Sequence, residues 1–287
     1  MILLLLALAA QAPSLPSSPD PMPTPRSVPA AQAPAARPAA PSAAADPIER
    51  RYRDCAALAR SNPGGAIEVA NAWRVEGGGI YARQCLGLAY ITLERWAPAA
   101  TVYEQAAQEA EAAGDPRRTD LRLQAGNAWI AAGDPTKALV AFDLALRAPD
   151  LTGERRGGIH LDRARALVAL DNPAGARADL DRALRLVASD PIAWYLSAAL
   201  ARRANDLGRA QTDIARAQQL APDNPDILLL AGTIAGLAGN MAEAGRLYRR
   251  VVELAPESDA GRAARASLEG SAPAPPAAAP QPQPQSR

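Results

Sequence analysis

The sequence has few of the residues on which enzymes and metal proteins depend. Its 287 residues include one histidine, two cysteines and one phenylalanine, and aromatic residues make up 4%. A metal site needs His, Cys or carboxylate residues clustered at ligand spacing, which this composition does not supply. His160 has no serine or cysteine in a nucleophile context beside it, so we expect it to pack rather than act as a base. We therefore expect no enzyme activity, no catalytic residue, no metal and no cofactor.

A strong charge of one sign is also missing. The chain has 31 basic and 30 acidic residues, a formal net charge of +1, and Lys137 is its only lysine. Nucleic-acid-binding domains are usually markedly basic, so we expect no nucleic-acid partner. Gly77-Gly78-Gly79 is not followed by Lys-Ser or Lys-Thr, as a phosphate-binding loop would be, and we expect a turn between helices there. We expect no small-molecule substrate.

Alternation typical of β-strands is absent, whereas signals for helices are frequent. Apolar residues recur at steps of three and four, which places them on one face of a helix. Asp-Pro or Asn-Pro pairs, which combine an N-cap with a proline at the first helical position, mark helix starts. They are Asp115-Pro116, Asp134-Pro135, Asn172-Pro173, Asp190-Pro191 and Asn224-Pro225. Glycines expected at helix ends are Gly114, Gly133, Gly239 and Gly270. The sequence therefore predicts an all-α fold.

A repeat of 34 residues is clearest near the C-terminus. Residues 190–194 and 224–228 open two segments in which Ala210, Ile214, Ala217 and Pro222 return as Ala244, Tyr248, Val251 and Pro256. A fixed period of this length indicates one helical unit stacked on copies of itself. Because alanine is abundant, matches at small residues alone could arise by chance. The joint placement of large residues, small residues and turn residues favours a true repeat.

This pattern resembles the tetratricopeptide repeat, as Trp194, Ala198, Ala210, Ile214 and Pro222 show in one unit. The resemblance implies a right-handed superhelical solenoid of about six helix pairs with a C-terminal capping helix. The expected solenoid spans 46–270, with units at about 47–79, 80–113, 119–152, 157–190, 191–224 and 225–258 and a cap at 258–269. The first unit matches least well. Spacing widens between the middle units, and we expect longer interhelical turns there.

The two ends of the chain differ in composition from the repeats. Residues 1–12 form an apolar run ending in Ala10-Gln11-Ala12, typical of a signal peptide with an A-x-A cleavage site, although no basic residue precedes it. The alternative is an unexported apolar N-terminus. Residues 13–45, rich in Pro and Ala, and 271–287, rich in Pro and Gln, are expected to be a disordered tether and tail. We expect a bacterial protein exported to the periplasm or secreted, with a cytoplasmic location as the alternative.

Cys55 and Cys85 fall on the first helices of neighbouring repeats, which lie side by side in the family that the sequence resembles. We expect a disulfide that strengthens the least well patterned end of the array. Two separate buried thiols are the alternative.

In the tetratricopeptide family, partners lie along a concave groove lined by the first helix of each unit. The resemblance assigns the groove positions to Arg51, Gln84, Leu88, Leu123, Asn127, Leu161, Arg165, Tyr195, Arg202, Arg203, Leu229 and Thr233. The alternative is that some of these are merely exposed helix residues. Asn127 matches one residue of the family's chaperone carboxylate clamp, but Leu123 stands where the clamp has lysine, so we do not expect that subtype.

Two classes of function follow from these expectations. The first is a non-catalytic scaffold or assembly adaptor that binds a peptide or protein partner in the groove. The alternative is a permanently docked accessory subunit of an envelope enzyme or transport complex. Exposed apolar residues on the convex face would favour the alternative.

Overall fold

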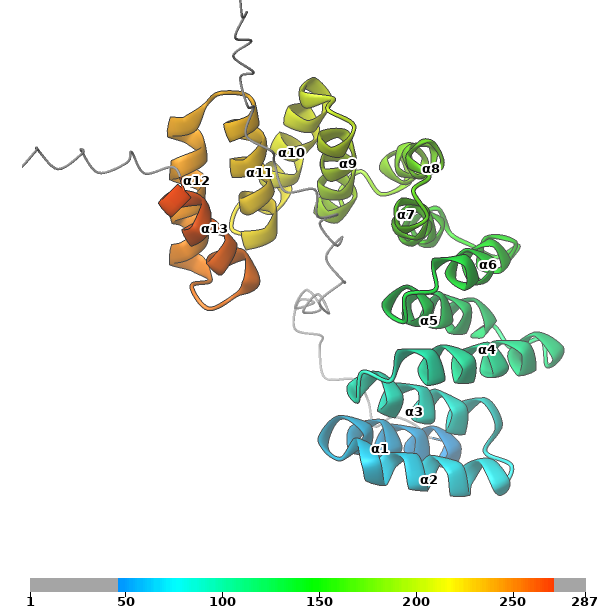
Figure 1. Ribbon diagram of the computed structural model, residues 1–287. Coiled ribbons are helices and arrows are strands. Elements are labelled where there is room, and N and C mark those ends of the chain that lie inside the picture. Colours follow the sequence, from blue (N-terminus) through cyan, green and yellow to red (C-terminus); the bar gives the residue numbers. More distant parts are fainter. Residues whose placement is uncertain (1–45, 271–287) are drawn as a thin grey trace, which may run out of the picture. The chain divides into compact units, whose positions relative to one another are not determined.

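The computed structural model describes residues 46–270, where every regular element is an α-helix (Figure 1). The helices are α1 (Pro47–Ser61), α2 (Pro63–Val75), α3 (Gly79–Thr92), α4 (Trp96–Ala112), α5 (Arg118–Ala131), α6 (Pro135–Leu146), α7 (Gly153–Ala169), α8 (Pro173–Leu186), α9 (Pro191–Arg203), α10 (Leu207–Leu220), α11 (Pro225–Leu237), α12 (Met241–Leu254) and α13 (Asp259–Gly270). The candidate signal peptide, tether and tail lie outside these residues.

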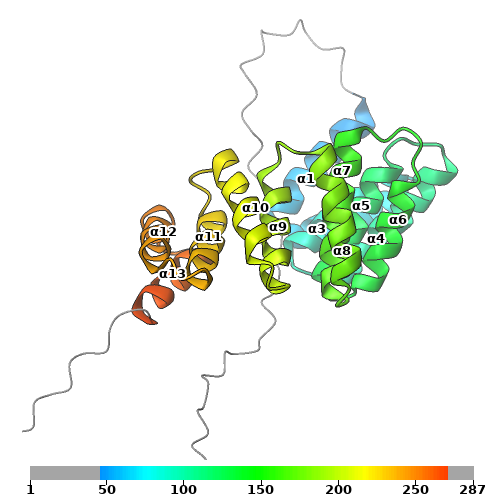
Figure 2. The same cartoon turned by 90° about the horizontal axis from the view of Figure 1, so that it is seen from above.

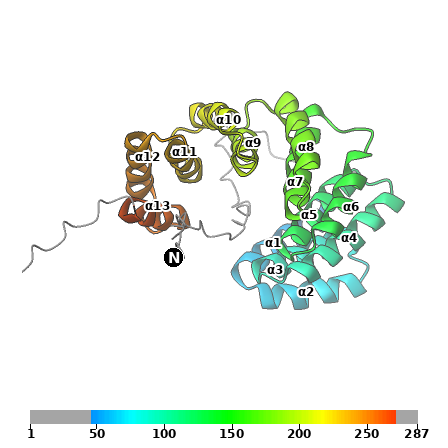
Figure 3. The same cartoon turned by 45° about the horizontal axis from the view of Figure 1, so that its top comes forward.

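The helices pack as six consecutive pairs, from α1 with α2 to α11 with α12. The second helix of each pair also contacts the first helix of the next pair, so each unit rests on its neighbours. Figures 2 and 3 show the pairs following one another in chain order. The last helix, α13, packs against α12 and α11. This arrangement confirms the expected solenoid of helix pairs with a single helix at its C-terminal end.

Four of the five predicted Asp-Pro or Asn-Pro caps begin a helix, namely those of α6, α8, α9 and α11. The Asp134 carboxylate accepts from the backbone N–H of Lys137 at 3.1 Å, and the Asn172 amide oxygen accepts from that of Gly175 at 2.9 Å. Proline occupies the first helical position after both caps, where a missing N–H costs nothing.

The start predicted at Asp115-Pro116 is wrong, because α5 begins at Arg118. The Asp115 carboxylate accepts from the backbone and the side chain of Arg117, both at 2.9 Å. These bonds form an Asx turn, in which the Asp115 side chain bonds the backbone two residues later. The helix α5 begins after this turn.

The wider spacing between the middle units lengthens two helices as well as the turns at 113–117 and 147–152, which are longer than the turns at 187–190 and 221–224. Helices α4 and α7 each have 17 residues, whereas the others have 12 to 15. At 1.5 Å per residue, about three extra residues extend a helix by roughly one turn. The extra turn of α7 begins at Gly153, where the Thr152 hydroxyl caps the N–H of Arg155.

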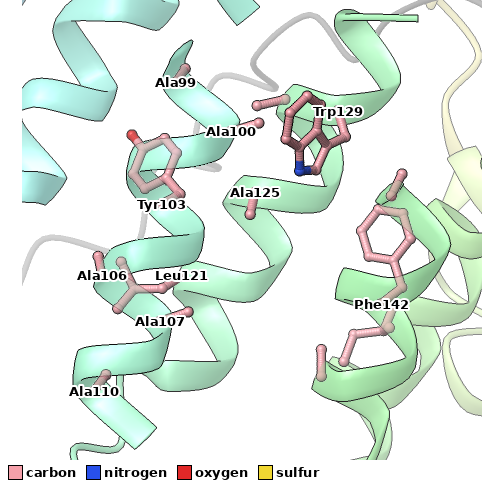
Figure 4. Close-up of a cluster of buried hydrophobic side chains, with 14 of the residues drawn as sticks. Ala99, Ala100, Tyr103, Ala106, Ala107, Ala110, Leu121, Ala125, Trp129 and Phe142 are labelled. Carbon is pink, nitrogen blue, oxygen red and sulfur yellow. The ribbon is translucent and has the colours of Figure 1, made fainter. Parts of the chain in front are cut away.

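The core consists of a few large side chains set among alanines (Figure 4). Tyr103 of α4, Trp129 of α5 and Phe142 of α6 are buried, and burial raises the pKa of Tyr103. Glycine in a first helix faces an aromatic ring of the second, as Gly126 does with Phe142. Small residues of this kind let helix axes approach and large ones fill the remaining space.

Candidate functional site

The predicted groove residues lie on the first helices α1, α3, α5, α7, α9 and α11, and we call the surface they form the first-helix face. Most of its members are accessible to some degree. Arg51 and Arg203 are exposed; Gln84, Leu88, Leu123, Asn127, Tyr195, Arg202, Leu229 and Thr233 are partly buried; Leu161 and Arg165 are buried. Leu161 and Arg165 therefore offer little surface to a partner.

An aromatic and cationic group lies at the N-terminal part of this face. The rings of Tyr52 and Tyr81 are 5.5 Å apart between centroids, and the Arg117 guanidinium lies 3.9 Å from the centroid of the Tyr81 ring. Arg117 also donates to the Gln84 side chain at 3.4 Å. Burial raises the pKa of Tyr52, although the charges of Arg60 and Arg117 oppose the shift. Three of these residues, Tyr52, Tyr81 and Arg117, were not among the predicted groove positions.

Arg117 is fixed in this group from two sides. Its side chain pairs with Asp115 at 2.5 Å, and this hydrogen bond lowers the pKa of the Asp115 carboxyl. Because the guanidinium is held over a tyrosine face by an acidic neighbour, it stays in place without a partner bound. Cation–π and charge-assisted contacts are both stronger when partly desolvated.

A polar chain crosses from α5 to α7 in the middle of the face. The Asn127 side-chain N–H donates to Asp162 at 3.1 Å, and Arg165 pairs with the other oxygen of Asp162 at 3.1 Å. Burial raises the pKa of Asp162, more than Arg165 and Asn127 lower it. The Asn127 Oδ1 atom is buried and accepts no hydrogen bond from the residues that the structure describes. The bond from the Nδ2 atom to Asp162 therefore orients the Asn127 amide, and its Oδ1 atom is left without a donor among the described residues.

The C-terminal part of the face combines apolar and cationic groups. Arg203 lines a cavity of about 160 Å³ together with Val168 and Leu200. On α11, the Thr233 hydroxyl donates to the backbone oxygen of Leu229 at 3.0 Å and accepts from the Tyr248 hydroxyl at 3.4 Å.

Arg51, the predicted groove residue of α1, is engaged with the following helix. It pairs with Glu76 at 2.7 Å, and its guanidinium lies 4.8 Å from the centroid of the Trp73 ring. The Arg51 side chain therefore lies against α2, and it would have to break its contacts with Glu76 and Trp73 to reach a ligand.

His160 is buried, as expected of a packing residue, but it is also hydrogen-bonded. Its Nδ1 lies 3.0 Å from an oxygen of Asp179, a fully buried carboxylate of α8. Arg163 and Arg182 each approach the same carboxylate at 3.0 Å. Burial raises the pKa of Asp179, but the hydrogen bonds and charges of His160, Arg163 and Arg182 outweigh it and the pKa is lowered. The group ties α7 to α8.

An equivalent buried carboxylate, Asp213 of α10, lies 34 residues after Asp179. It accepts from the Ser197 hydroxyl of α9 and from Arg209 at 3.3 Å. Neither carboxylate was predicted from the sequence, although their spacing of one repeat was a signal that could have identified them. Within residues 46–270, no group of three or more His, Cys, Asp or Glu side chains could hold a metal ion.

The two cysteines meet between α1 and α3. Their sulfur atoms are at bonding distance, 1.94 Å apart, and the Cα atoms are 5.9 Å apart. Both residues are buried in an apolar cluster with Ala59, Leu86 and Val102. The first and third helices of the array are therefore positioned for a covalent link.

Comparison with known proteins agrees with this fold. The profile of the tetratricopeptide repeat family matches residues 161–225 and 198–259. No curated protein matches the sequence. Among solved structures, PilF of Pseudomonas aeruginosa is 18% identical, with a TM-score of 0.58 over 77% of this chain and 99% of that one.

Two further solved structures share this fold at a similarly low sequence identity. PilW, described as a widely conserved type IV pilus biogenesis factor, is 19% identical, with a TM-score of 0.62 over 75% of this chain and 96% of that one. BtubC from P. vanneervenii is 17% identical, with a TM-score of 0.54 over 84% of this chain and all of that one. The tetratricopeptide repeat profile covers residues 161–259, and the helix pairs continue through the rest of the described residues, so the fold is that of a tetratricopeptide repeat solenoid.

Proposed function

We propose that this protein is a non-catalytic scaffold that binds an extended peptide or a helix of a partner protein along the first-helix face. The observation that carries the proposal is Asn127, whose amide is oriented by Asp162 while its Oδ1 atom accepts no bond from the described residues. A buried acceptor without a partner is costly, and a backbone N–H of a bound peptide would supply the donor once the neighbouring side chains shift to expose the Oδ1 atom, as interface side chains commonly do on binding.

The aromatic and cationic residues on either side of Asn127 suit the same ligand. Tyr81 is partly exposed and contacts both the tilted ring of Tyr52 and the guanidinium of Arg117. Tyr195 and Arg203 lie on α9, beyond the polar chain of α5 and α7. Tyrosine and arginine contribute strongly to protein interfaces when neighbouring groups hold them in place.

The test starts from peptides selected with the full-length chain from a random display library. Their affinity is then measured by calorimetry for wild type, Asn127→Ala, and the double variant Tyr195→Ala with Arg202→Ala. The control variant is Gln211→Ala with Arg216→Ala, two exposed residues of the second helix α10. We expect the face variants to weaken binding by roughly tenfold or more, since such anchors contribute over 1 kcal/mol. Equal weakening by the control, or no weakening by the face variants, would refute the assignment.

The alternative function, permanent docking on a folded subunit, receives less support from the surface. Large exposed apolar residues of the second helices are Val69, Val75, Val140, Leu186, Met241 and Leu254, spread over four helices. Scattered apolar residues of this kind are ordinary on protein surfaces, whereas docking surfaces are contiguous. A scaffold that binds through the first-helix face is therefore the function we propose.

We also propose that the protein is exported to the bacterial envelope. The proposal rests on the signal-like run of residues 1–12 and on the cysteine pair, because disulfides persist mainly in oxidising compartments. None of the helices within residues 46–270 is long and apolar enough to span a membrane. Fusing alkaline phosphatase, which is active only after export, behind residue 45 tests the signal. An inactive fusion would contradict export.

A further inference from the structure

A second candidate site, separate from the first-helix face, lies where α4, α5 and α6 come together at their ends. It is a cavity of about 460 Å³. Its charged lining consists of Arg118 and Arg122 of α5, Arg147 at the end of α6, and Glu111 in the last turn of α4. Leu144 and Pro149 contribute apolar wall. The volume is within the range of pockets that bind small molecules.

Two of the three arginines are held rigidly in the wall. The side chains of Arg118 and Arg122 are only 17% and 16% exposed. Arg122 donates to the backbone oxygen of Leu144 at 3.2 Å, and Arg118 approaches the backbone oxygen of Asp115 at 3.5 Å. These bonds fix the guanidinium planes before any ligand arrives, which lowers the entropy cost of binding.

Arg147 completes the group and has its donors free. The structure gives its guanidinium no hydrogen bond or ion pair with any residue between 46 and 270. A guanidinium carries five N–H donors, so the three arginines together offer many more donors than their protein partners use.

The arginines already bind carboxylates from the rim of the cavity. Glu111 pairs with Arg122 at 2.6 Å and is 52% exposed, and Asp150 pairs with Arg118 at 3.1 Å and is 60% exposed. Exposed ion pairs of this kind contribute little to stability. Both carboxylates can therefore swing away, and each shows the geometry that an incoming anion would adopt.

The ends of α4 and α6 place partial negative charge here, of about half an elementary charge each. Arg122 offsets part of this charge through its bond to the Leu144 oxygen. Three arginines against Glu111 and Asp150 leave a formal charge of +1, which the two helix ends offset, so the cavity becomes positive when these two carboxylates move off the arginines.

We propose that this cavity binds a small multivalent oxyanion, a phosphate or a di- or tricarboxylate, with Arg118 and Arg122 as fixed donors and Arg147 as the mobile one. Planar carboxylates and phosphates match the forked donors of arginine. Glu111 and Asp150 act as internal competitors that occupy Arg122 and Arg118 in the absence of the anion. The site goes beyond the proposed scaffold function and does not depend on it.

The test is calorimetric titration of the full-length protein with inorganic phosphate and, separately, with citrate, at low ionic strength. Arg147→Ala removes the free donor. Arg185→Ala is the matched control, because Arg185 is the exposed arginine at the equivalent position 38 residues later, in the last turn of α8, and it does not line the cavity. Glu111→Gln removes one competitor. Thermal unfolding monitored for each variant confirms that the fold is retained.

We expect at least one of the two anions to bind wild type, and the ratio of their affinities distinguishes a phosphate site from a carboxylate site. Arg147→Ala should weaken binding by about tenfold, the value of one charge-assisted contact. Glu111→Gln should strengthen it by several-fold, and Arg185→Ala should leave it unchanged. Absence of binding to wild type at millimolar anion, equal loss in both arginine variants, or weaker binding by Glu111→Gln overturns the proposal.

Discussion

The ring of Tyr103 lies directly against the α-carbon of Gly87, so that a β-carbon at Gly87 would come within 2.6 Å of the ring carbon Cζ. The same relationship holds between Gly232 and Tyr248, at 2.7 Å from the ring. In the two units between residues 157 and 224, the corresponding pairs are Ala164 with Leu180 and Ala198 with Ile214. Glycine thus accompanies an aromatic ring, and alanine accompanies an aliphatic side chain.

Gly87→Ala should therefore lower the free energy of unfolding, by about 1 to 3 kcal/mol as for other overpacked cores. Adding Tyr103→Leu to Gly87→Ala recreates the pair found at Ala164 and Leu180. The double variant should be more stable than the sum of the two single changes predicts, because the substituted residues are in contact. Urea unfolding of the four proteins measures this coupling, and strict additivity would contradict it.

Two glycines three residues apart should respond to alanine in opposite directions. Gly239 follows α11 at φ +83, in the left-handed region, where an L side chain costs about 1 to 2 kcal/mol. Gly236 lies inside α11, and a β-carbon there would make ordinary contact with Ala244 at 3.8 Å. Alanine at 236 should stabilise the helix by up to about 1 kcal/mol. Thermal melts of Gly236→Ala and Gly239→Ala measure both changes. A melting temperature shifted in the same direction in both variants would contradict the prediction.

The cysteine pair should be oxidised in the exported protein and should stabilise the N-terminal end of the array. Cys55 and Cys85 are 30 residues apart, and a loop of that length gives about 3 to 4 kcal/mol in the chain-entropy account. Thiol labelling of unfolded protein should detect no free thiol before reduction and two after it. Protease digestion should then cut α1 faster in reduced protein, with α12 unaffected as an internal control. Two free thiols in unreduced protein would contradict the bond.

Asp179 should make stability depend on acid pH. Its pKa in the folded protein is lowered, so it stabilises the fold above its unfolded pKa of about 3.9, and this contribution is lost as pH falls through that value toward the folded pKa. Asp179→Asn should lower the unfolding free energy at pH 7 by about 1 to 3 kcal/mol, since bonds to an ionised group are lost. The decline of stability between about pH 5 and pH 2 should also become shallower.

The control for this effect is Asp54→Asn. Asp54 is an exposed residue of α1, and the structure gives it no ion pair with a described residue. The control should keep the acid-pH slope of wild type. If the free energy of unfolding falls equally steeply with pH in Asp179→Asn and in wild type, Asp179 is not the source of the pH dependence.

The fold could be predicted from the sequence because its main determinants are local. Proline after Asp134 or Asn172 starts a helix wherever the rest of the chain lies, and glycine at 133 or 239 ends one. Asp115 misled the prediction, because an Asp side chain can cap a turn as well as a helix and Arg117 decides between the two. The extra residues of α4 and α7 were placed in turns because spacing alone does not say where an insertion lies.

The candidate sites depend on contacts between repeats, which a template for one repeat does not contain. Tyr81 and Arg117 belong to different units and meet only after the first helices have stacked. The basic cavity likewise needs three helix ends at once. Arg165 had a groove position by its place in the repeat, but it is buried and pairs within α7 with Asp162, which also accepts from Asn127 of the neighbouring helix α5. Position in a repeat predicts packing well and exposure less well.

The helix α13 closes the C-terminal end of the array, so additional repeats can be inserted before it. Its Gly261 is so close to the backbone of Ala255 that even a β-carbon would clash, which fixes α13 onto the unit before it. The unit of residues 191–224 is followed by an equally long unit, and the interface between them is built from one repeated pattern. Tandem copies of residues 191–224 inserted after residue 224 should therefore fold in register and extend the scaffold in equal steps, so that the distance between its two ends becomes an adjustable quantity.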